Sequence, residues 1–105
     1  MVDLRSTLWR QYIRPFALSV PSVRQYAAST EWQQYEEILH YDWLRRPPGS
    51  SCTFEEIRWV LLRHSFLIRY WGYIQGYVYI VLPLCTVLRN RHHVLYATVR
   101  VLGAT

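Results

Sequence analysis

The chain has 105 residues, so it forms one domain at most. Its formal net charge is +5, every basic residue is arginine, and 51% of the residues are hydrophobic, which argues against wholesale disorder. The sequence contains no Ser–His–Asp or Cys–His arrangement, no phosphate-binding loop and no dinucleotide-binding glycine pattern. We therefore expect a protein that is not an enzyme.

Residues 1–29 form a basic N-terminal arm that is rich in arginine, serine and threonine and contains a single acid, Asp3. This composition is typical of a mitochondrial transit peptide, and the run "RQYAAS" is similar to a matrix-protease site. Because the chain includes Met1, we expect the arm to be retained. The arm predicts a mitochondrial location, and the alternative is an ordinary basic surface segment.

Residues 30–46 are expected to form an amphipathic helix. It opens with "TEWQ", a capping box in which the side chain of Thr30 accepts from the amide of Gln33. Its apolar residues recur at helical spacing: Trp32, Tyr35, Ile38, Leu39 and Trp43. A Pro/Gly/Ser turn at residues 47–52 ends this helix, because two prolines and a glycine do not continue it.

A second capping box, "TFEE", begins at Thr53, with Glu56 as the return partner. No helix breaker follows before Tyr70, so the sequence predicts one helix over about 53–88, roughly 54 Å long. A compact domain of this length is only about 30 to 35 Å across. We therefore expect an all-α fold without an independent globular core, in which one or two short amphipathic helices precede a long helix that protrudes.

The segment 70–88 contains no charged residue and approaches the roughly 20 residues that cross a bilayer. This pattern predicts a transmembrane helix, and the alternative is a helix buried within a protein. Expected anchors at the membrane surfaces are aromatic residues on one side and arginines on the other: Tyr70, Trp71, Tyr73, Arg89 and Arg91. Residues 89–105 are expected to form a basic C-terminal tail.

On a continuous helix the small and polar residues share one face, which predicts a helix-packing surface: Ser65, Arg69, Gly72, Gly76 and Pro83. Gly72 and Gly76 form a GxxxG motif, which allows close approach of a second helix. The nine residues "RYWGYIQGY" resemble the arginine-flanked GxxxG spans of the small e and g subunits at the ATP synthase dimer interface. The resemblance implies that Gly72 and Gly76 pair with another small subunit.

Cysteine and histidine spacings do not predict a metal or cofactor site. Cys52 and Cys85 are 33 positions apart, which fits neither a CxxC redox pair nor a zinc site, so we expect two unbridged thiols, and the alternative is a single bridge between them. His92 and His93 are neighbours and would point about 100° apart on a helix. No metal, no cofactor and no catalytic residue is therefore expected.

The sequence as a whole favours a non-catalytic accessory subunit of a mitochondrial inner-membrane energy-transducing complex, either ATP synthase or a respiratory-chain complex. Its expected partners are other subunits of that complex and the lipid bilayer, with anionic phospholipid at the arginine-lined ends and no nucleic acid. Tyr, Trp and Arg, which commonly anchor protein interfaces, are abundant in the chain. Two alternatives remain open: a mitochondrial ribosomal or RNA-binding structural protein, and a membrane assembly factor.

Overall fold

A computed structural model describes residues 8, 22–49, 51–67, 73 and 75–102 of the chain. This part of the chain is helical and contains five helices: α2 (Arg24–Ala27), α3 (Thr30–Leu44), α4 (Phe54–Leu67), α5 (Tyr77–Leu88) and α6 (Arg91–Leu102). The all-helical prediction is therefore confirmed for the described residues.

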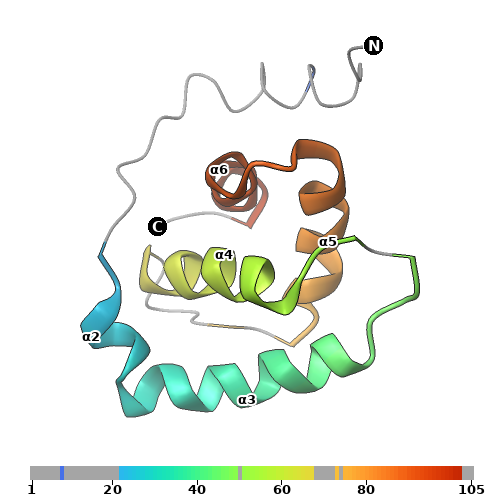
Figure 1. The fold of residues 1–105 in the computed structure, drawn as a ribbon. Coiled ribbons are helices and arrows are strands. Elements are labelled where there is room, and N and C mark those ends of the chain that lie inside the picture. Colours follow the sequence, from blue (N-terminus) through green and yellow to red (C-terminus); the bar gives the residue numbers. More distant parts are fainter. Residues whose placement is uncertain (1–7, 9–21, 50, 68–72, 74, 103–105) are drawn as a thin grey trace.

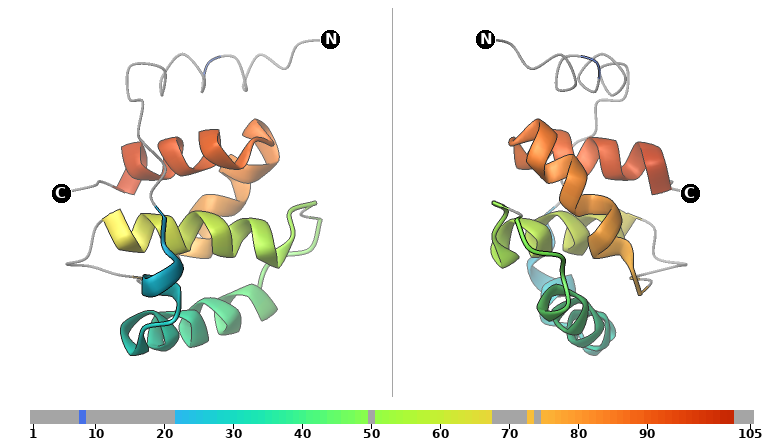
Figure 2. Two further views of the ribbon diagram at one scale, coloured as in Figure 1. Left: turned by 60° about the vertical axis from the view of Figure 1, so that its left-hand side comes forward. Right: turned by 90° about the vertical axis from the view of Figure 1, so that its right-hand side faces the viewer.

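Helix α4 lies between α3 and α6 in the views of both Figure 1 and Figure 2. Helix α5 packs against all three of these helices, α3, α4 and α6. Each of the four long helices contributes buried apolar residues, among them Trp32, Leu39, Ile57, Leu61, Val78, Val81, Leu95 and Val99. The radius of gyration is 13.4 Å, close to the roughly 13 Å expected of a compact chain of this length. The expectation of no independent core is wrong.

Helix α3 begins where the sequence indicates, but its capping residue is different. The Ser29 hydroxyl accepts a hydrogen bond from the Trp32 amide at 3.2 Å and donates one to the Tyr26 carbonyl at 2.6 Å. Ser29 therefore occupies the N-cap position that the capping box assigned to Thr30. The helix ends at Leu44, before the prolines of the turn.

The start of α4 follows the sequence prediction. The Thr53 hydroxyl accepts a hydrogen bond from the Glu56 amide at 3.2 Å, and the helix runs from Phe54. Thr53 thus satisfies one of the amides that lack a partner at a helix start.

The prediction of one helix over 53–88 is wrong. Helix α4 ends at Leu67, Tyr73 is not helical, and Gln75 and Gly76 form a turn before α5 begins at Tyr77. Gly76 has φ +100°, a left-handed conformation that glycine adopts at little cost. Residues 68–72 and 74 lie outside the described part of the chain.

A second break separates α5 from α6 within the expected C-terminal tail. Arg89 takes a left-handed conformation with φ 63°, and its amide donates to the Cys85 carbonyl at 3.1 Å. The Asn90 side chain then accepts from the His92 amide at 2.9 Å, which caps α6. Residues 91–102 are therefore helical and contribute Val94, Leu95 and Val99 to the core.

The break at Gly76 also removes the expected membrane span at 70–88. Helix α5 has 12 residues, about 18 Å, whereas a hydrocarbon core is about 30 Å thick. Among the described residues, no helix combines the length and the apolar character that a membrane crossing requires.

Candidate functional site

Arginine and aromatic side chains from two helices meet around Trp59. The guanidinium carbon of Arg63 lies 4.1 Å from the centroid of the Trp59 indole, and that of Arg91 lies 4.5 Å from it. The His92 ring is 5.0 Å from the same indole. We define the Trp59 cluster as Arg58, Trp59 and Arg63 of α4 with Arg91 and His92 of α6.

Local sequence explains how the cluster forms. Trp59 and Arg63 are four residues apart on α4, so their side chains lie one above the other on one face. Arg91 is the first residue of α6, and the Asn90 cap fixes where that helix begins. The close packing of α6 on α4 then brings Arg91 and His92 against the indole.

The charges of the Trp59 cluster are not balanced. Arg58 donates from Nε to Glu36 of α3, and both side chains of this ion pair are about one-third exposed. Arg63 and Arg91 have no ion pair with a described carboxylate. Partial burial, with repulsion from Arg91 and then Arg58, holds the pKa of Arg63 below its ordinary value. The cluster can therefore offer positive charge, N–H donors and an aromatic face to an anionic group.

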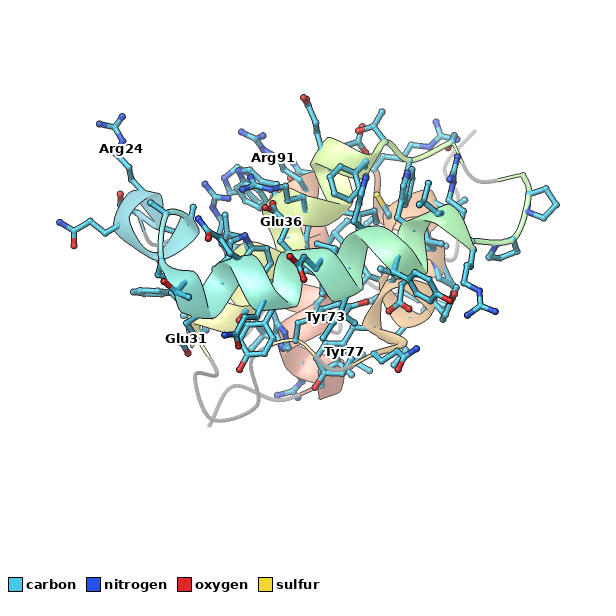
Figure 3. All side chains as sticks on the ribbon, turned by 90° about the horizontal axis from the view of Figure 1, so that it is seen from below. Arg24, Glu31, Glu36, Tyr73, Tyr77 and Arg91 are labelled. Atoms are coloured by element: carbon cyan, nitrogen blue, oxygen red, sulfur yellow. The ribbon has the colours of Figure 1, made fainter. Side chains whose placement is uncertain are left out.

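The view from below locates this region relative to α3. Figure 3 shows Glu36 and Arg91 on the same side of α3 in this view, with Arg24 at the α2 end of the molecule, where it points outward. Tyr73 and Tyr77 lie on the other side of α3, with ring centroids 5.6 Å apart.

The residues of the expected helix-packing face belong to different surroundings. Ser65 of α4 is fully buried and forms a 2.6 Å hydrogen bond with the Tyr26 hydroxyl. Gly76 precedes α5 in a left-handed turn, and Pro83 is exposed within α5. Arg69 and Gly72 lie outside the described residues. The described members do not share one helix face, because the continuous helix that would align them is absent.

The expected membrane anchors are also placed differently. Tyr73 is buried, and its hydroxyl donates to the Asp42 carboxylate. Arg89 caps the end of α5, and Arg91 lies over Trp59. Tyr70 and Trp71 lie outside the described part of the chain.

A second group of chemically active side chains was missed by sequence reasoning. Cys52, Glu56 and Cys85 have donor atoms that all lie within 4.8 Å of one another. Neither cysteine forms a disulfide, as expected. Burial, then hydrogen bonding to Cys52, raises the pKa of the Cys85 thiol. Linear spacing could not reveal this group, because the return of α5 onto α4 brings the two cysteines together.

Comparison of the chain with family models, with curated proteins and with solved structures finds no match.

Proposed function

We propose that this chain is a non-catalytic subunit that binds an acidic surface of a larger protein assembly through the Trp59 cluster. The observation that carries the proposal is the pair of guanidinium groups, Arg63 and Arg91, held beside Trp59 without a described carboxylate. Arginine binds carboxylates bidentately, and Arg and Trp dominate the binding energy of many interfaces.

The energetics of the free chain favour such a partner. Arg63 is partly desolvated, and its positive charge is repelled by Arg91 and Arg58. A carboxylate placed between these groups would replace repulsion with attraction. The indole and guanidinium groups are already packed together, so little side-chain entropy is lost when the partner binds.

The cellular context of this subunit is a further part of the proposal. Residues 1–29 have the composition of a mitochondrial targeting segment, which supports a place in a mitochondrial energy-transducing assembly. Residues 70–88 no longer support a membrane span, because α5 starts only at Tyr77. Import into isolated mitochondria tests this proposed location. The wild-type chain is compared with a variant in which Arg5, Arg10 and Arg14 are replaced by Gln.

An RNA partner is the second candidate, and one observation favours it. Guanidinium groups beside an indole can stack on a base and bind a phosphate at the same time. We place this candidate second because Glu36 is part of the same surface and its carboxylate repels phosphates.

The test compares two double variants with the same change of charge. Arg63→Gln with Arg91→Gln removes the two charges beside Trp59, whereas Arg24→Gln with Arg100→Gln removes two exposed charges outside the cluster, one on α2 and one in the last turn of α6. We expect the first pair, and not the second, to lose one-to-one co-migration with its complex on a native gel, with mass spectrometry of the band as the readout. Equal retention of both pairs would contradict the proposal.

Purified protein separates the two partner classes. Poly-L-glutamate and a single-stranded RNA of equal charge serve as the anionic probes, and binding is followed by fluorescence anisotropy. We expect the Arg63/Arg91 pair of substitutions to weaken poly-L-glutamate binding by about 10-fold or more, since each charge-assisted hydrogen bond contributes about 1.5–3 kcal/mol. Tighter binding of the RNA, with the same loss in that variant, would favour the RNA candidate.

A further inference from the structure

The group formed by Cys52, Glu56 and Cys85 has the donor types of a metal site. Cys52 lies just before α4, Glu56 lies in the first turn of α4, and Cys85 lies on α5. The Cys85 sulfur is 3.5 Å from Oε2 of Glu56, and the three donor atoms lie within 4.8 Å of one another.

We propose that Cys52, Glu56 and Cys85 bind one Zn²⁺ ion. This inference goes beyond the proposed function and does not depend on the Trp59 cluster.

The distances suit a tetrahedral zinc ion. With Zn–S bonds of about 2.3 Å, two sulfur ligands of a tetrahedral ion are about 3.8 Å apart. The present separations need only a small contraction to reach this value. Both thiols are buried, whereas Glu56 is exposed, so solvent reaches the group and a water molecule can serve as the fourth ligand.

The donor set selects among metals. Two thiolates with a carboxylate suit Zn²⁺, which accepts sulfur and oxygen ligands together. Copper(I) favours soft sulfur donors and would leave Glu56 unused, whereas Mg²⁺ and Ca²⁺ favour oxygen donors alone.

Zinc binding requires two thiol protons to leave. One Zn²⁺ ion with two thiols and one carboxylate gives a zinc complex with two thiolates and the carboxylate, of net charge −1, and releases two protons. No electron is transferred. Cys52 and Glu56 lie at the start of α4, where the helix dipole favours negative charge.

The bound ion would join the start of α4 to the second half of α5. These segments are distant in sequence, and a small chain gains stability when a metal ties such segments together. We therefore expect zinc to raise the midpoint of thermal unfolding of the full-length chain.

The test titrates the reduced full-length protein with Zn²⁺ alone, in competition with a chromophoric chelator. We expect one zinc ion per chain and a loss of affinity of at least about 10-fold in Glu56→Gln. Glu55→Gln is the matched control, because Glu55 is the adjacent exposed carboxylate outside the group. Co²⁺ in place of zinc should give a thiolate charge-transfer band in the wild type that is weaker in Cys85→Ser, because that variant keeps only the Cys52 thiolate.

Two control measurements separate loss of zinc binding from loss of folding and from failure of the proposed function. Circular dichroism checks that Cys85→Ser is folded, and where it is not, the surface pair Glu56→Gln and Glu55→Gln decides. The Arg63→Gln/Arg91→Gln variant should bind zinc as the wild type does, so failure of the proposed function leaves this result intact. Equal zinc affinity in Glu56→Gln and Glu55→Gln, or the absence of a thiolate band with Co²⁺, would overturn the proposal.

Discussion

Tyr73 shows how a single buried residue couples the stability of this chain to pH. Its hydroxyl donates to the Asp42 carboxylate, and both residues are buried. Burial, followed by this hydrogen bond, raises the pKa of Tyr73 above its ordinary value. The folded chain thus favours the neutral hydroxyl. The sequence predicts a different role for this tyrosine, as an anchor at a membrane surface.

The raised pKa of Tyr73 makes the folded chain less stable at high pH. The folded pKa of Tyr73 is raised above the unfolded value of about 10. The stability that the neutral hydroxyl contributes is therefore complete below about pH 10 and is lost as the pH rises further.

Comparison with Tyr73→Phe isolates this contribution. We expect the substitution to lower the free energy of unfolding by about 1–2 kcal/mol at pH 7, because Asp42 loses a donor. The difference between the two proteins should shrink above about pH 10, as urea unfolding at a series of pH values would show. Burial also raises the pKa of Tyr77 and Cys85, but both groups are present in each protein. A difference that stays constant up to pH 11 would count against this account of Tyr73.

Among the helices, the decisive feature is the break between α4 and α5. Asp42 of α3 accepts hydrogen bonds from the Tyr73 hydroxyl and, at 2.9 Å, from the Gly76 amide. The Tyr79 hydroxyl also donates to the Asp42 carbonyl at 3.4 Å. One acidic residue of α3 thus holds both the turn and the start of α5.

Removal of this carboxylate should destabilise the whole chain. We expect Asp42→Ala to lower the free energy of unfolding by about 3 kcal/mol, because the buried Tyr73 hydroxyl and the part-buried Gly76 amide both lose their partner. The exposed Glu37→Ala on the same helix should change it by less than about 0.5 kcal/mol. Chemical denaturation of both variants provides the measurement, and similar losses in the two would show that Asp42 has no special role.

Sequence reasoning located the start of α4 and the end of α3, but it missed the breaks before α5 and before α6. The Thr53 cap and the proline-rich turn after α3 follow from local chemistry, so they could be read from short motifs. The break at Gly76 depends on Asp42, 34 residues earlier, and no local pattern contains that contact. Helix α6 was missed because Asn90, its cap, lies among charged residues that resemble a polar tail.

The candidate sites also combine features that short motifs reveal with contacts between segments far apart in the sequence. Arginine and tryptophan abundance indicated an interaction protein, but only the packing of α6 on α4 brings Arg91 to Trp59. Likewise, the cysteines are far apart in sequence and meet only because α5 folds back.

Both sites in this molecule therefore require that α5 and α6 return onto α4. If residues 53–88 formed one helix, positions 55 and 86 would be about 46 Å apart. In the folded chain their neighbours Glu56 and Cys85 are in contact, at 3.5 Å.

The most direct measurement is the distance between spin labels at positions 55 and 86, two exposed sites, in a chain whose native cysteines are replaced by serine. Pulsed electron paramagnetic resonance should give a single distribution at a distance well below about 46 Å. A distribution centred near about 46 Å would mean that α4 and α5 are continuous. Neither the Trp59 cluster nor the Cys52–Glu56–Cys85 group could then exist as described.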